Sequence, residues 1–390
     1  MDGIARARAL RSTAARVAGR PRSARASQFD IDVATAADDG EIRRLLRESA
    51  FAGRVSLSLE REPDSRLAAA IEGDAHEQLV ARERRSGRVA GIAGRAFRDV
   101  FVNGAPSRVA YLGQLRIDAR FRRSRGLLDA GFEFCRQSHG GLLHLASIVA
   151  DNEPARRLLS RAVDGWPRFD AIDTLVTLAI PVRHVRQRPG GIDLQPASPE
   201  WRAEILGCLA RNGRRYQFYP QWKDEHFDSP RLRGLSLSDF TVAVSGGRAI
   251  GCLAVWDQRA FKQAIVRGYA GRLARWRPVV NLLSPWLRTP RLPAVGLPLE
   301  FAYLSHVAVD EDDDNVLVAL VRDACVRASA RGLEYIALGL PARSPVLSAV
   351  ERSFAHRRYE SLLYAVTWPD VEAVAASLDG RPANPEIALL

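Results

Sequence analysis

The stretch that decides the fold is Tyr111–Leu128, with the sequence YLGQLRIDARFRRSRGLL. Its apolar start predicts a strand over Val109–Asp118, and the periodic apolar positions after the turn predict a helix over Gly126–Gln137. A glycine lets the backbone approach a ligand closely, and the free N–H groups and dipole of a helix start favour an anion. The segment therefore predicts a phosphate site, with a basic surface turn as the alternative. The turn also holds four arginines: Arg120, Arg122, Arg123 and Arg125.

The same pattern occurs twice in the chain. Tyr111–Asp118 reads like Tyr303–Asp310, 192 residues further along, with Tyr, Leu and Asp identical. The common order of several weaker matches predicts a duplicated domain. Those matches are Ile31-Asp32-Val33 with Ile192-Asp193-Leu194, Gly91-Ile92-Ala93 with Gly251-Cys252-Leu253, Cys135 with Cys325, and Gly141-Leu142 with Gly332-Leu333.

The spacing of the matches predicts the domain limits. We expect a basic disordered arm over residues 1–28, one domain over 29–187 and a second over 188–390, with the break near Pro189-Gly190-Gly191. The spacing grows from 160 to 192 residues within the second copy, which places an insertion near residues 258–299. Within it, Phe261–Trp276 predicts a basic amphipathic helix, and the prolines that follow argue against helix beyond it.

Strands and helices alternate through the first copy. This order predicts an α/β (α+β) fold of two tandem mixed-sheet domains. The further elements we expect are helices over Asp38–Ser49 and Glu153–Ala162, and strands over Gly87–Arg95, Leu142–Val149 and Thr174–Ile180.

Two motifs carry a family resemblance. Arg123-Ser124-Arg125-Gly126-Leu127-Leu128 resembles the acyl-CoA loop of the Gcn5-related N-acetyltransferases (GNAT), Arg/Gln-x-x-Gly-x-Gly/Ala, with Leu128 in place of the last small residue. Asn152-Glu153-Pro154-Ala155 resembles that family's Asn-x-x-Ala helix start. The resemblance covers about Phe29–Val185 and, more weakly, Gly191 onwards. It implies a tandem GNAT protein whose second copy is degenerate.

The resemblance also implies roles for these residues. It implies acetyl-CoA or another acyl-CoA as co-substrate, attacked directly by an amine with no covalent enzyme intermediate. Leu115, Arg116 and Ile117 would bind the pantetheine arm and polarise the thioester carbonyl through backbone N–H groups. Asn152 would contact the cofactor arm. The pyrophosphate would be held by Arg122, Arg123, Ser124, Arg125, Gly126, Leu127 and Leu128.

Departures from the family pattern decide the catalytic candidates. Leu159 stands where the family often has a tyrosine acid, and Tyr111 stands where it often has a carboxylate. Tyr111 and Gln114 are therefore our catalytic candidates, with a packed aromatic as the alternative for Tyr111. His144 lies in an apolar strand, which favours a structural role. In the second copy, five consecutive acids from Asp310 to Asp314 would repel a pyrophosphate.

Two aromatic and amide-rich segments remain, Arg214–Trp222 and Trp256–Gln263. Such clusters suit either the pocket of a polar acceptor or an interface between domains. Gln217 and Lys262 are the residues in them that we expect to contact an acceptor.

Composition bounds the function. The 390 residues (43.0 kDa) include no apolar run long enough to span a bilayer, and the four cysteines form no CxxC pair. We therefore expect a cytoplasmic protein without a bound metal. Half of the net charge of +12 lies in the arm, which suits a disordered tail, a transit peptide or a weak anion-binding segment. No basic stripe interleaved with aromatics follows, so we expect no specific nucleic-acid partner.

The sequence thus favours an acyl-CoA-dependent N-acyltransferase that transfers acetyl to an amine of a small polar acceptor. A non-catalytic CoA-binding pseudo-transferase is one alternative, favoured by Leu128 and Leu159. A Fem-type aminoacyl transferase that uses charged tRNA is the other, and the basic charge would suit it.

Overall fold

The computed structural model describes residues 28–51, 53–183, 185, 191–287 and 290–390. The arm expected over residues 1–28 lies outside them apart from Gln28, and so does most of the expected domain break. The first half consists of β1 (Phe29–Val33), α2 (Asp39–Glu48), β2 (Val55–Glu60), α3 (Ser65–Glu72), β3 (Ala75–Glu83), β4 (Val89–Val102), β5 (Ala105–Ile117), α4 (Arg125–Ser138), β6 (His144–Val149), α5 (Glu153–Leu159) and β7 (Arg168–Pro181).

The second half follows a similar order, without counterparts of β2 and α3 among the described residues and with other elements added. It consists of β8 (Asp193–Pro196), α6 (Arg202–Gly213), β9 (Phe240–Ser245), β10 (Arg248–Trp256), β11 (Gln263–Tyr269), α7 (Arg272–Leu287), β12 (Phe301–Val309), α8 (Asp314–Ala330), β13 (Tyr335–Pro341), α9 (Leu347–Ser353), β14 (Arg357–Thr367) and α10 (Glu372–Ala376). The predicted helices and strands of the first half are all present, although α5 ends at Leu159 and β4 continues to Val102.

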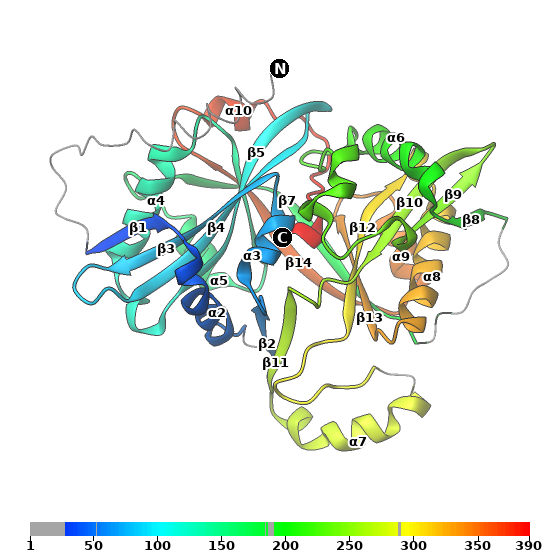
Figure 1. The fold of residues 1–390 in the computed structure, drawn as a ribbon, viewed down its shortest axis with the longest axis horizontal. Helices are drawn as coiled ribbons and strands as arrows, with labels where there is room; N and C mark the ends of the chain where they lie inside the picture. The colour runs from blue at the N-terminus through cyan, green and yellow to red at the C-terminus, as the bar shows by residue number, and fades with distance from the viewer. Residues whose placement is uncertain (1–27, 52, 184, 186–190, 288–289) are drawn as a thin grey trace.

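Within the described residues, twelve strands form one continuous sheet, in the order β1-β3-β4-β5-β6-β14-β7-β13-β12-β10-β9-β8 (Figure 1). Only two neighbouring pairs in it are parallel, β5 with β6 and β12 with β13. The predicted mixed-sheet α/β class is confirmed.

The two halves exchange their last strands. β7 pairs on one edge with β13 and on the other with β14, both from the second half. β14 in turn pairs with β6 of the first half. The hydrogen bonds of β7 therefore run to the second half of the chain, and the halves share one sheet.

A bulge occurs at the same place in the two stretches that the sequence aligns. The β4–β5 register shifts opposite Gln114, and the β10–β12 register shifts opposite His306. Both residues have positive φ, 56° and 54°, which a bulged residue can adopt. Beyond the bulge the parallel pairing stops: β5 and β6 pair only from Ala110 to Leu112. The two strands thus open a gap at their carboxyl ends.

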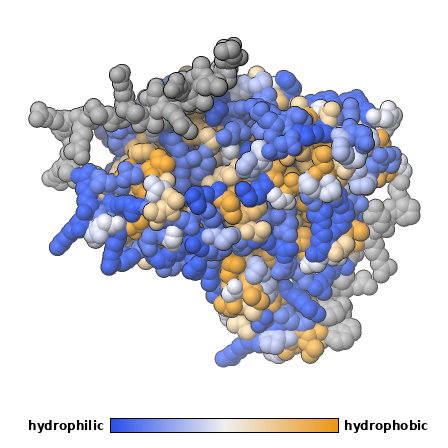
Figure 2. Space-filling model, in the orientation of Figure 1, coloured by the Kyte–Doolittle hydropathy of each residue, from blue (hydrophilic) through white to orange (hydrophobic). Residues whose placement is uncertain are grey.

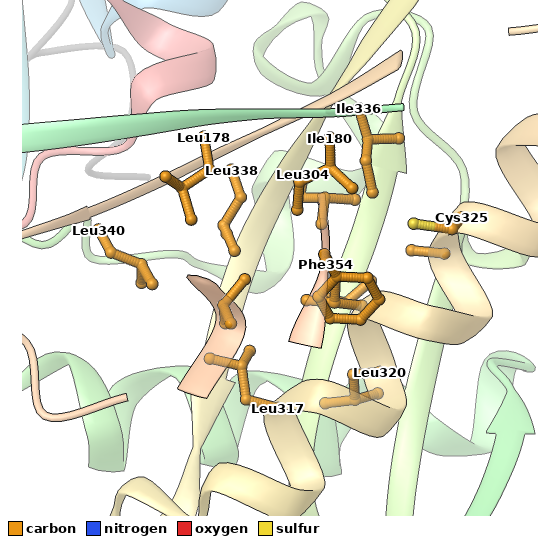
Figure 3. Close-up of a cluster of buried hydrophobic side chains, with 14 of the residues drawn as sticks. Leu178, Ile180, Leu304, Leu317, Leu320, Cys325, Ile336, Leu338, Leu340 and Phe354 are labelled. Carbon is orange, nitrogen blue, oxygen red and sulfur yellow. The ribbon is translucent and has the colours of Figure 1, made fainter. Parts of the chain in front are cut away.

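Packing differs between the halves. In the second half α8 lies directly on the sheet, where a Cβ added at Gly251 would be 2.8 Å from Val316 Cγ1. Leu317 and Leu320 of α8 belong to one large buried cluster with sheet residues (Figure 3). In the first half the buried clusters are smaller, and a Cβ at Gly131 of α4 would meet no atom within 4 Å. Space therefore remains between α4 and its sheet.

The prediction for the insertion was wrong in detail. Residues 263–269 form β11, which pairs with β2 of the first half, and the helix α7 follows with Pro278 and Pro285 inside it. Pairing with a distant strand overrides the local helical pattern. A proline removes one N–H and crowds the preceding turn, and water can satisfy the freed carbonyl where the helix is exposed. None of the helices in the described residues is long and apolar enough to cross a membrane.

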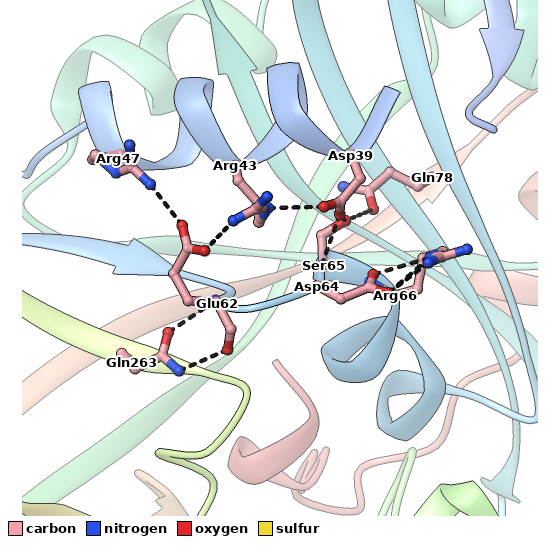
Figure 4. Close-up of polar contacts among 9 residues, drawn as sticks. All are labelled: Asp39, Arg43, Arg47, Glu62, Asp64, Ser65, Arg66, Gln78 and Gln263. Atoms are coloured by element: carbon pink, nitrogen blue, oxygen red, sulfur yellow. Dashed lines mark hydrogen bonds and ion pairs between the residues drawn. The ribbon is translucent and has the colours of Figure 1, made fainter. Parts of the chain in front are cut away.

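Side-chain contacts hold this insertion to the first half. Gln263 at the start of β11 exchanges two hydrogen bonds with the backbone of Glu62, at 3.1 and 2.9 Å (Figure 4). The carboxylate of Glu62 accepts in turn from Arg43 and Arg47 of α2. The β2–β11 ribbon is thereby fixed next to α2 and α3.

Candidate active site

A cavity of about 520 Å³ occupies the gap between β5 and β6. Its walls are mostly apolar and come from the sheet and from α4 and α5. Its far end is polar and combines both halves of the chain. The polar and aromatic lining residues there include Arg61, Glu72, Tyr111, Gln114, Arg116, Lys262 and Tyr303.

The start of α4 is open to an anion. Arg122 and Arg123 are exposed, and neither has a side-chain partner among the described residues, whereas Arg120 binds Asp118 at 3.0 and 2.6 Å. Ser124 is the N-cap residue but makes no side-chain cap bond. A Cβ added at Gly126 would meet no atom within 4 Å. These features match a ligand-binding helix start; the side chain of Arg125 lies outside the description.

The cavity lies between α4 and α5, and its lining includes none of residues 122–124 and 126. Leu127, Leu128 and Gly131 line it from α4, and Asn152 and Leu159 line it from the α5 segment. The Oδ1 atom of Asn152 accepts the Ala155 N–H at 3.3 Å, which caps α5. Leu159 thus makes this part of the wall apolar.

The edge of β5 forms the next part of the wall. Ile117 pairs with Gly91 of β4 on one side, while the other edge of β5 has no strand partner beyond Leu112 in the described part of the chain. Backbone groups on that edge are available to an extended ligand. Leu115 is partly exposed there, and the Arg116 side chain lies against the Phe51 ring, with Cζ 5.0 Å from its centre.

Tyr111 and Gln114 are both brought to the cavity. The Tyr111 hydroxyl lies 2.6 Å from Ser147 Oγ, and the Arg98 guanidinium lies 4.5 Å from its ring centre. Burial raises the pKa of Tyr111, so the phenol is protonated at neutral pH. The Gln114 amide donates to both carboxylate oxygens of Glu72, at 2.8 and 2.9 Å.

The sequence did not single out Glu72 or Arg61. Glu72 ends α3 and accepts from the buried Arg61 guanidinium, with His76 Nε2 at 3.2 Å. Burial alone would raise the pKa of Glu72, but the charge of Arg61 and the bond from His76 outweigh it and hold the pKa at about 2. No local pattern marks these residues, because only the folding of α3 against β5 brings them together.

Of the two expected acceptor residues, Lys262 alone lines the cavity. Its Nζ donates to the main-chain oxygen atoms of Leu390 and Ala388, at 2.7 and 3.3 Å, and burial lowers its pKa to about 8. Gln217 binds Asn103 at 2.6 Å and Asp379 at 2.8 Å, next to the β4–β5 hairpin. His144 is fully buried beside Trp368 and does not line the cavity.

In the second half the corresponding places are filled by the chain itself. Asp313 caps α8 by accepting from the N–H groups of Asn315 and Val316, and Asp310 binds Arg211. A short segment, Glu386–Leu390, occupies the gap between β12 and β13. A Cβ added at Gly339 of β13 would overlap its Ile387 side chain.

No protein-family model matches the sequence, and no curated protein matches it. Solved structures do match. One is the GCN5-related glucosamine N-acetyltransferase region of a fungal multi-domain GH3 β-N-acetylglucosaminidase, with a TM-score of 0.58, 14% identity, and coverage of 90% of this chain and 40% of that one. The chain has the GNAT fold. Another match is N-myristoyltransferase of Saccharomyces cerevisiae with bound myristoyl-CoA, with a TM-score of 0.57, 11% identity, and coverage of 90% and 85%.

Proposed function

We propose that this protein is an acyl-CoA-dependent N-acyltransferase whose cofactor binds in the first half. One observation carries the proposal: a single cavity runs from Leu127 in the first turn of α4, through the gap between β5 and β6, to a polar end. An extended thioester arm and an amine acceptor find matching chemistry along it, and the exposed Arg122 and Arg123 precede it in the chain. The GNAT fold of the chain agrees with this assignment.

The cofactor would lie along the cavity in a definite direction. Arg122, Arg123 and the first N–H groups of α4 would bind the pyrophosphate, and the free edge of β5 would bind the pantetheine arm. The second half supports the position of the thioester. There Glu386 Oε2 accepts the N–H of the bulged residue His306 at 2.9 Å. Gln114 corresponds to His306 in the aligned pattern, so its backbone N–H would donate to the thioester carbonyl oxygen.

The chemistry needs a proton relay. A neutral amine attacks the thioester carbonyl carbon, a C–N bond forms, and the C–S bond breaks with the electron pair leaving on sulfur. Tyr111 gives its proton to the thiolate and recovers one from the nitrogen of the collapsing intermediate. The bond between Tyr111 and Ser147 orients the phenol for both transfers. Glu72, ionised at neutral pH, would hold Gln114 in place.

We propose acetyl-CoA as donor and a small polar amine as acceptor. The second half would not bind CoA, since its own carboxylates occupy the α8 start. A non-catalytic CoA-binding protein is the second candidate, because Leu159 places an apolar wall where an acid would help a leaving thiolate.

Calorimetry with acetyl-CoA, together with detection of free thiol, tests the proposal. Gly126 and Gly40 are both second residues of helices, and a Cβ at either meets no atom within 4 Å. Gly126→Asp should weaken acetyl-CoA binding at least 100-fold, while Gly40→Asp should leave it unchanged. Myristoyl-CoA is measured beside acetyl-CoA. Binding without thiol release on adding amines supports the non-catalytic candidate, and no CoA binding refutes both.

A further inference from the structure

The polar end of the cavity holds more positive than negative charge. Arg61 is buried, and while one Nη donates to Glu72, its Nη1 has no partner among the described residues. Arg116 Nε is also buried and has no hydrogen-bond partner among the described residues. Lys262, only 9% exposed, points at main-chain oxygen atoms. Three cationic side chains and two carboxylates, Glu60 and Glu72, thus line this end.

The surrounding acids do not balance this excess. Burial and the nearby charge of Arg61 lower the pKa of Arg116 to about 10, so the two guanidinium groups lie close enough to repel. Glu60, the other acid lining this end, is bound to Arg267 and Ser58. Buried cationic N–H groups without partners cost free energy unless a ligand satisfies them.

We propose that this cluster, Arg61, Arg116 and Lys262, binds an anionic group of the amine acceptor, a carboxylate or a phosphate. A guanidinium binds either group through two parallel hydrogen bonds. Gln114 Oε1 is also buried without a partner and can accept from the amine beside it. The acceptor class is then an amine that carries an acidic group, such as an amino acid or an amino-sugar phosphate. The identification of the ligand as the amine acceptor rests on the proposed function, whereas the anion site itself does not.

Melting temperatures test the site without catalysis. With saturating CoA occupying the α4 start, sodium phosphate or sodium acetate should raise the melting temperature of the protein above that in sodium chloride of equal ionic strength. Arg116→Met should abolish this rise without lowering the melting temperature in chloride, because it removes a repelling buried charge. Arg108→Met, on the exposed part of the same strand, is the matched control and should keep the rise.

Paired acceptors test the substrate class. Glycine is compared with glycinamide, and glucosamine 6-phosphate with glucosamine, by thiol release. We expect at least tenfold higher kcat/KM for the anionic member of a pair, lost in Arg116→Met. Equal or better use of the neutral members overturns the inference and leaves the proposed function intact. If no amine releases thiol, the proposed function fails and the melting experiment decides: an anion effect absent from the native chain, or unchanged in Arg116→Met, refutes the site.

A separate observation concerns α7, which is held to the protein through polar side chains and leaves several large apolar side chains exposed. Arg277 Nε donates to the carbonyls of Leu292 and Pro293 at 3.0 and 2.9 Å, and Asn281 binds the backbone of Leu292 at 2.9 and 2.8 Å. The large apolar side chains that this leaves exposed are Trp276 (56%), Val279 (40%), Leu282 (66%) and Leu283 (41%). Apolar surface is visible at the lower end of the molecule, where α7 lies (Figure 1 and Figure 2).

The charge of the insertion indicates what covers these side chains. Residues 258–299 contain no Asp or Glu and eight basic residues. Of these, Lys262 is buried and Arg259 and Arg267 are paired with carboxylates, whereas Arg275 and Arg291 are exposed. Apolar side chains with tryptophan, surrounded by cationic residues, are typical of helices that lie on anionic membranes. We propose that α7 docks the protein on an anionic bilayer surface, with its exposed apolar side chains among the lipid headgroups.

Vesicle flotation tests the docking. The full chain should bind vesicles of equal parts phosphatidylcholine and phosphatidylglycerol at least tenfold more than pure phosphatidylcholine vesicles. Leu282→Asp combined with Leu283→Asp should remove most of this binding. Val374→Asp is the matched control: Val374 is 42% exposed on α10, at the opposite end of the molecule (Figure 1).

The basic arm is present in every variant and contains no tryptophan, so brominated lipid separates its contribution. Brominated phosphatidylcholine should quench tryptophan fluorescence, less in Trp276→Phe. Vesicle binding that is equal in the native chain and the Leu282→Asp/Leu283→Asp variant overturns the proposal. So does a dimer in solution that the same substitutions dissociate, because the exposed apolar side chains would then form a protein interface.

Discussion

Replacing Gly131 by leucine should raise stability and remove cofactor binding at the same time. Gly131 lies inside α4, lines the cavity, and leaves open space where a side chain would begin. Glycine costs about 1 kcal/mol in a helix interior relative to good helix formers. A leucine at this position would also bury apolar surface against Leu127 and Cys135, which line the same cavity. We expect a net gain of about 1–2 kcal/mol in the free energy of unfolding.

That gain in the free energy of unfolding corresponds to a small rise in the melting temperature. Unfolding entropy is about 0.8 kcal/mol/K for a chain of this length, so the melting temperature should rise by about 1–3 °C. The same side chain occupies the space proposed for the thioester arm. Acetyl-CoA binding by calorimetry should weaken at least tenfold, about 1.4 kcal/mol.

Gly207→Leu is the matched control. Gly207 is an exposed interior residue of α6, and a Cβ there also meets no atom within 4 Å. Gly207→Leu should raise the free energy of unfolding by the helix-propensity part of this gain, and it should leave acetyl-CoA binding unchanged. If Gly131→Leu binds acetyl-CoA as tightly as the native chain, the cofactor does not lie between α4 and the sheet, and the reasoning fails.

Three further predictions test the second half and the polar end. Asp313→Ala should lower the free energy of unfolding by about 1 kcal/mol through loss of a helix cap, with calorimetry still giving one CoA per chain; two would contradict the filled second site. With a pKa of about 8, Lys262 is cationic below that pH, so KM for an anionic acceptor should be flat below pH 8 and rise above it, and Lys262→Arg should flatten the profile to pH 10. A flat native profile would contradict its role. Gly339→Ala should destabilise the chain by about 1–3 kcal/mol in chemical denaturation, because its Cβ overlaps Ile387; an unchanged midpoint would show that the Glu386–Leu390 segment is not packed there.

The strand-turn-helix unit could be predicted because its signals are local. The strand over Val109–Asp118 and the helix after Arg125 follow from apolar periodicity and a turn within some thirty residues. The alignment of Tyr111 with Tyr303 also brings the two bulges to equivalent positions, since Gln114 and His306 are aligned by it. Repetition thus supplied information that a single copy would not.

The strand exchange could not be predicted, because it depends on contacts between distant segments. Thr174–Ile180 predicts a strand equally well whether its neighbour is β6 or β13. β11 likewise owes its conformation to pairing with β2, which lies some 200 residues earlier. The buried Arg61 and Glu72 were missed for the same reason, since an isolated arginine and a helix-terminal glutamate have no sequence signature of burial.

The reason that a protein segment fills the gap in the second half also bears on the cavity of the first half. A diverging parallel pair leaves backbone N–H groups on its open edges, and these must be satisfied by a ligand, by water or by the protein. In the second half Glu386 satisfies the N–H of His306. The segment that follows it then reaches the other cavity, where Ile387 and Leu390 line the wall and a main-chain oxygen of Leu390 accepts from Lys262. The peptide that closes one gap therefore builds part of the polar end of the other, so the second half shapes the polar end of the cavity.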